Sequence, residues 1–200
     1  MNAAVLPVTA AAEAADQQRQ WALDGQLVRA CQAARSEEHF AALVQRHETW
    51  VRNLLRALCG DAAQADDLAQ DSFIIAWQKL STLKVPEKFQ GWLKQLAYRQ
   101  FLHWQRRQKL EARHAQTSTD DGVMFAGDID IELQQSLQHC SGLERELLLL
   151  HYGFGFTVGE LAESQGSPAG TIKSHLHRAR QKIRQHLEAE GSLAGRPGDV

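Results

Sequence analysis

The clearest structural signal in the sequence is "TVGELAESQGSPAGTIKSHLHRAR", residues 157–180. Thr157 stands three residues before Glu160, which is the pattern of a capping box at the start of a helix. Gly166 predicts the end of that helix, because glycine accepts the left-handed backbone found at many helix C-termini. Pro168 predicts the first turn of a second helix, where its missing N–H leaves no hydrogen bond unmade. Two short helices joined in this way predict a helix-turn-helix.

The second helix of this motif is predicted to have two unlike faces. Apolar residues recur on it at steps of four, three and four and predict a stripe that holds it against a core. That stripe consists of Ile172, Leu176, Ala179 and Ile183. Other residues supply donors that can reach base edges near the helix start and phosphates further along. The residues predicted to contact duplex DNA are Ser167, Pro168, Thr171, Lys173, Ser174, His175, His177 and Arg178.

A basic helix face also has a plainer interpretation. Residues 170–187 contain five Lys or Arg side chains, three histidines and no acid, and such a face is more often simply solvated. The turn signals beside it favour DNA binding instead. His175 and His177 are two residues apart and point to different sides of a helix, so we predict no metal site there.

The chain as a whole is not basic, because its 22 Lys and Arg residues are outnumbered by 24 Asp and Glu residues, a formal net charge of -2. Any nucleic-acid surface must therefore be local. No apolar run of membrane-spanning length and no signal-peptide pattern occurs, so we expect a soluble, cytoplasmic protein without membrane insertion. Cys31, Cys59 and Cys140 are widely spaced and odd in number, which predicts small core residues in a reducing compartment rather than disulfides or zinc ligands.

The periodic segments are helical and no alternating strand pattern occurs, so the expected fold class is all-α. We predict two small helical domains joined by a flexible linker that is rich in Ser, Thr, Gly and Asp, with the helix-turn-helix in the C-terminal domain. Within the first domain, Gly60 and Asp61 predict the end of one helix and the cap of the next. The predicted boundaries are a flexible N-terminal extension at 1–24, a helical domain at 25–113, the linker at 114–130, the second domain at 131–188 and a flexible tail at 189–200.

The segment "QADDLAQDSFIIAWQKL", residues 64–80, predicts a helix with a protein-binding face. Phe73 and Trp77 lie on its apolar side, whereas Asp67, Asp71 and Ile74 line up at steps of four and three on another. A row of acids beside an exposed isoleucine is typical of a protein contact, and a merely solvated face is the alternative. Catalysis is not predicted, because nothing nearby supplies a cleft or a substrate-positioning group for these carboxylates.

The next segment, "STLKVPEKFQGWLKQLAYRQFLHWQRRQK" at residues 81–109, mixes aromatic and basic residues. That combination suits single-stranded DNA, because bases stack on aromatic rings while cations follow the phosphates. Core packing is the competing use of the same rings. We therefore expect only one or two of the aromatic side chains in this segment to be exposed.

With both halves considered, the chain resembles the extracytoplasmic-function (ECF) group of bacterial RNA polymerase sigma factors. The region 2 pattern of that family, A-E-D-L-V-Q-D-V-F followed by a tryptophan, is matched by "ADDLAQDSF" at 65–73 and by Trp77. Its region 4 pattern, E-I-A-E followed by G-T-V-K-S-R-L-x-R-A-R, is similar to "ELAE" at 160–163 and "GTIKSHLHRAR" at 170–180. The resemblance covers about residues 25–187.

The resemblance implies a factor that binds core RNA polymerase and directs promoter-specific initiation without chemistry or a cofactor of its own. Residues expected to bind the polymerase are Asp66, Asp67, Gln70, Asp71, Ile74 and Gln78. The loop from Lys84 to Gly91 is expected to capture an unstacked base of the −10 element and to help melt promoter DNA. Residues expected to contact that element are Lys84, Lys88, Phe89, Gln90, Tyr98, Arg99, Arg106 and Arg107. The helix-turn-helix would read the −35 element, and an anti-sigma factor is an expected partner.

Two rival interpretations stay open at this point. "TIKSHL" is also close to the recognition helix of LuxR-type regulators, which would bind duplex DNA without polymerase; the acidic segment at 64–80 has no counterpart there. A sigma-like decoy that binds polymerase or an anti-sigma factor without initiating is the second. Arg99 and His103 stand where sigma factors usually have Asn and Asp, and His175 stands where Arg is usual, so a different promoter preference is expected.

Overall fold

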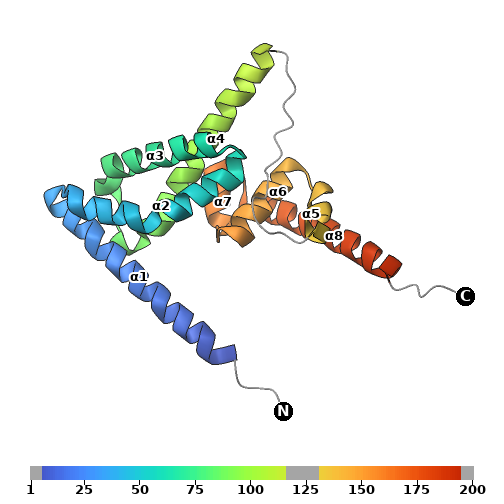
Figure 1. Ribbon diagram of the computed structural model, residues 1–200, viewed down its shortest axis with the longest axis horizontal. Coiled ribbons are helices and arrows are strands. Elements are labelled where there is room, and N and C mark those ends of the chain that lie inside the picture. The colour runs from blue at the N-terminus through green and yellow to red at the C-terminus, as the bar shows by residue number, and fades with distance from the viewer. Residues whose placement is uncertain (1–5, 116–130, 195–200) are drawn as a thin grey trace, which may run out of the picture. The chain divides into compact units, whose positions relative to one another are not determined.

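The structure is a computed structural model that describes residues 6–115 and 131–194, with side chains described at 15–111 and 135–188 (Figure 1). Every regular element within those ranges is helical, and no strand occurs in them. The predicted all-α class is therefore confirmed. Among the helices described, none is both long and apolar enough to cross a membrane.

Four helices make up the N-terminal part of the chain: α1 (Leu6–Ala34), α2 (Glu37–Cys59), α3 (Ala62–Lys79) and α4 (Phe89–Ala115). Two short 3-10 turns, η1 (Leu80–Thr82) and η2 (Pro86–Lys88), connect α3 to α4. The predicted end of α2 at Gly60 and the predicted cap of α3 at Asp61 are confirmed. Gly60 has a left-handed φ of 68°, and an Asp61 carboxylate oxygen accepts a hydrogen bond from the Gln64 backbone N–H at 3.1 Å.

The N-terminal helix begins earlier than the sequence pattern indicated. Residues 1–24 are predicted to be a flexible extension, yet α1 starts at Leu6 and Asp24 is only 1% exposed. The alanine-rich sequence favours a helix by propensity alone. Asp24 then gains partners on α2 that its sequence position does not reveal, and these are described below.

The C-terminal part consists of α5 (Ile131–Gln138), α6 (Gly142–Leu148), the π-helical turn η3 (Leu149–Gly153), α7 (Val158–Gln165) and α8 (Ala169–Ala194). The long helix α8 packs against α5, α6 and α7. Fully or almost fully buried side chains form the core of this part, namely Leu147, Leu150, Phe156, Leu161, Ile172, Leu176 and Ala179. The C-terminal helix continues to Ala194, past the predicted domain end at 188.

Two compact units follow from the backbone contacts of the chain. One comprises Met1–Asn53 and Asp66–Gln100, and the other comprises Leu54–Ala65 and Phe101–Val200. The dividing lines thus fall within α2, α3 and α4. The predicted domain limits stay a prediction, because most of the predicted linker, at 116–130, lies outside the described residues.

Candidate functional site

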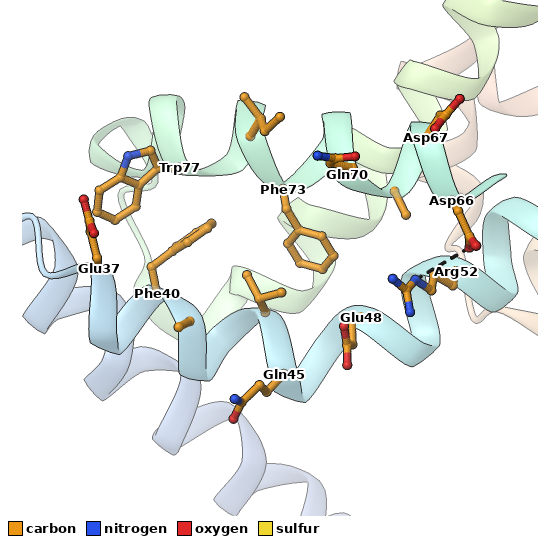
Figure 2. A pocket seen from close by; sticks show the side chains of 14 residues that line it. Glu37, Phe40, Gln45, Glu48, Arg52, Asp66, Asp67, Gln70, Phe73 and Trp77 are labelled. Atoms are coloured by element: carbon orange, nitrogen blue, oxygen red, sulfur yellow. Dashed lines mark ion pairs between the residues drawn. The ribbon is translucent and has the colours of Figure 1, made fainter. Parts of the chain in front are cut away.

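A groove of about 740 Å³ runs between α2 and α3 (Figure 2). Large apolar side chains from both helices line it. From α2 they are Phe40 and Val44, and from α3 Phe73, Ile74 and Trp77. The rings of Phe40 and Trp77 lie 4.9 Å apart between centroids in a tilted contact, so aromatic side chains close this end of the groove.

Charged side chains of mostly one sign surround the apolar floor. Four carboxylates line the groove, from Glu37 and Glu48 on α2 and from Asp66 and Asp67 on α3. Arg52 is the cation among the lining residues, and its Nε lies 3.6 Å from an Asp66 carboxylate oxygen. With four negative charges and one positive charge, the groove lining has a net charge of −3. An amphipathic helix with an apolar face and basic flanks is the kind of partner that fits such a groove.

The outer face of α3 continues this surface. Asp67, Gln70, Asp71, Ile74 and Gln78 are all exposed, as their helical spacing predicts, and Ile74 keeps 47% of its surface open. On the opposite side, the predicted apolar residues Phe73 and Trp77 are buried and half-buried. Their neighbours on that side are buried as well, namely Ala69, Ala76 and Leu80. Asp66 is partly covered, since it pairs with Arg52. Five of the six predicted polymerase-binding side chains are thus freely available.

The residues predicted to contact the −10 element divide into two groups. Lys84, Lys88, Arg99, Arg106 and Arg107 are exposed, and Gln90 is half-buried. The remaining two are fully buried at 0% exposure: Phe89 and Tyr98. These two side chains pack in the core of the fold and present no ring to a base, so they are removed from the set of predicted DNA contacts.

The other rings of α4 follow the same pattern. Phe101 is 1% exposed, and Trp92 and Trp104 are half-buried. Core packing thus takes most of the aromatic side chains, which is the competing use that the sequence left open. Past Phe101, α4 presents a run of exposed residues that includes Arg106, Arg107 and Lys109. The basic surface here is better suited to phosphates than to stacking.

The α7–α8 pair has the predicted capping geometry. The Thr157 hydroxyl accepts a hydrogen bond from the Glu160 backbone N–H at 3.2 Å, and a Glu160 carboxylate oxygen accepts one from the Thr157 N–H at 2.7 Å. Gly166 ends α7 with a left-handed φ of 64°. The Pro168 carbonyl then accepts from the Thr171 N–H at 2.9 Å at the start of α8. The helix-turn-helix prediction is confirmed in its caps and its turn.

The two predicted faces of α8 are also present. Ile172, Leu176 and Ala179 are buried, and Ile183 is half-buried. Most of the residues predicted to contact duplex DNA are exposed, and Ser167 and His175 are half-buried. Arg178 lies 3.0 Å from His175 Nδ1, which orders two of the basic side chains on this surface.

A partly buried ion pair fixes α8 to α6. Lys182 Nζ lies 2.6 Å from a Glu144 carboxylate oxygen, and Glu144 is only 4% exposed. Burial by itself would raise the pKa of Glu144, but the hydrogen bond and charge of Lys182, with the Ser141 N–H, outweigh it and hold that pKa below its ordinary value. One of the basic residues of α8 therefore serves the fold rather than DNA.

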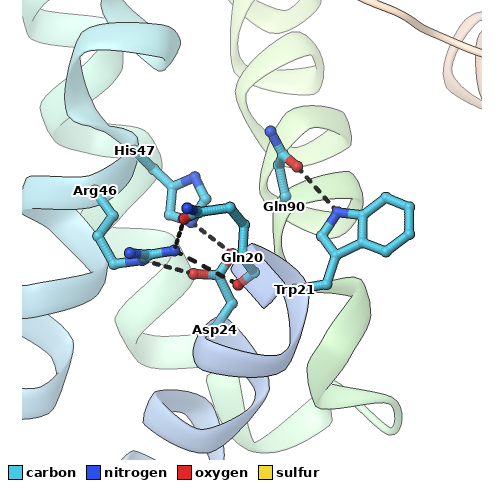
Figure 3. A network of polar contacts seen from close by, with 6 residues as sticks. All are labelled: Gln20, Trp21, Asp24, Arg46, His47 and Gln90. Carbon is cyan, nitrogen blue, oxygen red and sulfur yellow. Dashed lines mark hydrogen bonds and ion pairs between the residues drawn. The ribbon is translucent and has the colours of Figure 1, made fainter. Parts of the chain in front are cut away.

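The sequence did not indicate a polar cluster that joins α1 to α2 (Figure 3). Arg46 Nε donates to one Asp24 carboxylate oxygen at 2.9 Å, and His47 Nε2 lies 2.9 Å from the other. Burial alone would raise the pKa of Asp24, yet His47 and then Arg46 outweigh it and lower that pKa. The Asp24, Val28 and Cys31 spacing of four and three is the signal that marks this buried side of α1.

Burial raises the pKa of all three cysteine thiols. All three are free, and Cys31 and Cys140 are buried. Burial raises the pKa of the Cys59 thiol to about 12, which disfavours the reactive thiolate. No cluster of metal-binding side chains occurs among the residues that the structure describes.

Comparison with known families and proteins agrees with these two surfaces. The Sigma-70 region 2 family matches residues 43–111, and the Sigma-70, region 4 family matches residues 130–183. The first range contains all of the groove lining except Glu37, Phe40 and Ala41, and the second contains the helix-turn-helix. Each family therefore covers most or all of one candidate surface.

Several curated relatives extend the similarity along most of the chain. It is 25% identical over 168 residues to the ECF RNA polymerase sigma factor SigW of Bacillus subtilis, covering 76% of this chain and 90% of that protein. It is 27% identical over 167 residues to the "Probable RNA polymerase sigma factor RfaY" of Xanthomonas campestris pv. campestris, covering 78% of this chain. The match spans only 42% of that longer relative.

A solved structure shares the fold. The sigma factor RpoE from Bartonella quintana, crystallised in complex with the anti-sigma factor NepR, superposes with a TM-score of 0.59 at 24% identity. The superposition covers 74% of this chain and 96% of that one. The two family matches, the relatives and the geometry of both surfaces agree, and the chain belongs to the extracytoplasmic-function (ECF) group of the sigma-70 RNA polymerase sigma factors.

Proposed function

We propose that this protein is a promoter-specificity factor that binds core RNA polymerase, recognises −10 and −35 elements and assists promoter melting, without catalysis of its own. The observation that carries the proposal is the presence in one chain of an acidic apolar groove and a basic reading helix. The first suits a protein partner and the second suits DNA. Neither surface alone would select a promoter and also deliver it to a polymerase.

Core polymerase binds at the groove and the outer face of α3 in this proposal. Ile74 is an exposed apolar side chain flanked by Asp67 and Asp71, and the groove beside it has a net charge of −3 from its lining residues. Apolar contact supplies affinity, and the acids select a basic partner and speed its association. The acids also repel DNA, so this surface is reserved for protein.

The −10 element is contacted by the exposed basic residues of the segment between α3 and α4 and of α4 itself. Lys84 and Lys88 neutralise phosphates beside the captured base, and Gln90 has an amide that can pair with a base edge. Arg99, Arg106 and Arg107 follow the strand along α4. Phe89 and Tyr98 support these residues from within the core.

The −35 element is read in the major groove by the start of α8. Thr171, Lys173 and Ser174 lie in its first two turns, where a recognition helix meets base edges, and His177 and Arg178 follow. These few cations make weak contacts on their own at physiological salt. Attachment to polymerase raises the effective concentration of the helix at the promoter, so the two surfaces act together.

An anti-sigma factor is a further proposed partner. Structures with the same fold include the Bartonella quintana sigma factor bound to NepR and CnrH bound to the cytosolic domain of CnrY, the latter with a TM-score of 0.55 at 21% identity. A helical inhibitor that covers the groove between α2 and α3 would compete directly with core polymerase. The groove offers it the same apolar floor and acidic rim.

Run-off transcription tests the proposal. The purified protein is added to core polymerase on promoters recovered from genomic DNA, and transcripts that need both components are the expected result. Sequence-specific duplex binding without polymerase would favour a LuxR-type regulator. Polymerase binding without transcripts would favour a decoy.

The acidic face has its own test. Replacing Asp67→Lys and Asp71→Lys together is expected to weaken core binding by at least about tenfold, because two exposed acids become cations facing a basic partner. Glu188→Lys is the matched control, since Glu188 is also an exposed acid but lies on α8, outside the groove and outside the predicted DNA contacts. Unchanged core affinity with intact helical circular dichroism would overturn the assignment of this surface.

A further inference from the structure

One face of α1 lies along the connection between α3 and α4. Trp21, Gly25, Arg29 and Gln32 are spaced at four, four and three residues, so they form a single stripe on the helix. Each of them meets a residue between Leu80 and Gln90, as the contacts below describe. We call these four residues the α1 stripe and residues 80–90 the connecting segment. Both belong to the same compact unit.

Gln32 makes the most buried of these contacts. Its side-chain Nε2 donates to the Leu80 carbonyl at 2.8 Å and to the Leu83 carbonyl at 3.0 Å. Leu80 and Leu83 are themselves buried, so their carbonyls depend on protein donors. A single amide thus fixes both ends of η1, at the point where the connecting segment leaves α3.

Arg29 and Gly25 hold the middle of the segment through Glu87. The Arg29 guanidinium forms an ion pair with the Glu87 carboxylate, and that hydrogen bond is the largest cause that lowers the pKa of Glu87. Gly25 leaves room for this side chain. A Cβ at position 25 would lie 3.1 Å from Glu87 Cγ, closer than a relaxed contact.

Trp21 reaches the end of the segment. Its indole Nε1 donates to the Gln90 side-chain oxygen at 3.3 Å (Figure 3). This contact orients the Gln90 amide, the group that the proposed function assigns to a base edge. The exposed Lys84 and Lys88 lie between the fixed points, on a backbone whose course is set from α1.

We propose that the α1 stripe positions the connecting segment and so sets the base preference of this protein at the −10 element. The inference rests on the proposed function, in which this segment receives the unstacked −10 base. The stripe residues touch no base in this scheme, so they are positioning residues. They act through Glu87, Gln90 and the η1 carbonyls.

The test is run-off transcription with full-length protein and core polymerase on promoter libraries randomised at the −10 or at the −35 element. Arg29→Glu is expected to lower the ratio between the preferred −10 base and the next by about two- to fivefold, the range for an exposed ion pair. The doubly exchanged variant, Arg29→Glu with Glu87→Arg, is expected to restore the ratio. Arg19→Glu is the matched control, because Arg19 is exposed on the same helix and its ion pair, with Asp16, lies within that helix.

Gly25→Ala separates positioning from stability. Alanine has a higher helix propensity than glycine, so this variant should stay folded. Its Cβ requires the Glu87 side chain to shift by a few tenths of an ångström, so the −10 ratio is expected to fall, but by less than for Arg29→Glu. The −35 ratio and the affinity for core polymerase are expected to stay at their wild-type values in every variant of the stripe.

A triple variant of the connecting segment combines Lys84→Ala, Lys88→Ala and Gln90→Ala. It separates two claims: that the segment reads the −10 base, and that α1 positions the segment. If it changes the −10 ratio while Arg29→Glu and Gly25→Ala do not, the positioning role of α1 is wrong and the segment remains the reader. If the triple variant also leaves the ratio unchanged, the segment is not the reader, and both proposals fall. A double exchange that fails to restore the ratio overturns the role of the Arg29 pair.

Discussion

The α7–α8 motif and the α1 region use polar contacts over very different sequence distances. In the motif, Thr157 and Glu160 cap a helix across three residues. In the α1 region, contacts cross 22 residues between Asp24 and Arg46, 48 between Gln32 and Leu80, and 69 between Trp21 and Gln90. One region is specified locally and the other only after distant segments have met.

This difference has a consequence for function. A cap forms with its own helix, so its loss should loosen one helix and leave the rest of the fold intact. A long-range contact joins segments whose approach has an entropy cost that other interactions must offset. Its loss therefore affects every element that it joins. The caps and the turn of the α7–α8 motif are thus set locally, although Lys182 also ties α8 to Glu144 on α6, whereas the connecting segment depends on α1.

The largest expected effect is from Asp24→Ala. It leaves the Arg46 guanidinium and the buried His47 without their shared carboxylate, and breaking a buried pair costs about 3 kcal/mol of unfolding free energy. Denaturant titration followed by tryptophan fluorescence measures the loss. Asp16→Ala is the matched control on the same helix, because its ion pair with Arg19 is exposed and should contribute less than about 1 kcal/mol. Equal losses of unfolding free energy in the two variants would mean that the long-range contact of Asp24 is no more important to the fold than a local ion pair.

Acidification should weaken the same contact in wild-type protein. The folded-state pKa of Asp24 lies below its ordinary value of 3.8, so the unfolded chain binds the proton more readily. The stabilisation is therefore complete above about pH 5 and is lost as pH falls through the lowered folded-state pKa. The stability difference between wild type and Asp24→Asn is expected to shrink from pH 6 to pH 3 in denaturant titrations. A difference that stays constant over this range would contradict the role of the ionised Asp24.

The contrast between local and distant contacts also decides what the sequence could predict. The Thr157 cap, the Gly166 turn and the α8 stripe all involve residues a few positions apart, and each is found as predicted. The exposed face of α3 is predictable for the same reason. The partners of Asp24 and Gln32 are not, because hydrogen-bonding groups 22 or 48 residues apart leave no periodic signal.

None of the five aromatic side chains at 81–109 is fully exposed, so the expectation of one or two exposed rings was wrong. An aromatic ring can stack on a base or fill a core, and both uses place it on one face of the same amphipathic helix. Phe89 and Tyr98 proved to be core residues at 0% exposure. The groove between α2 and α3 was equally hidden, because its floor combines Phe40 and Val44 from one helix with Phe73 from another.

A smaller loss of unfolding free energy is expected when the cap of α7 is removed. Thr157→Ala removes the hydroxyl that accepts the Glu160 N–H and should cost about 1 kcal/mol. Thr157→Ser keeps the acceptor and is expected to lose much less. Denaturant titration of both variants, together with −35 binding by the polymerase holoenzyme, checks whether the loss stays within the α7–α8 motif. A change in the −10 base preference would argue that the two regions are not independent.

The smallest effect on stability is expected at the groove, from Arg52→Ala. The Arg52–Asp66 pair joins α2 to α3, but both side chains are almost half exposed, at 47% and 44%. Exposed pairs of this kind contribute less than about 1 kcal/mol, so denaturant titration should show little change. The same substitution takes the groove lining from −3 to −4, which should strengthen attraction to a basic partner at low salt. Core polymerase titration at low and high salt should therefore show a higher affinity for the variant that disappears as salt rises. Weaker core binding would mean that Arg52 contacts the polymerase, and a large loss of stability would place this pair among the long-range contacts that hold the fold together.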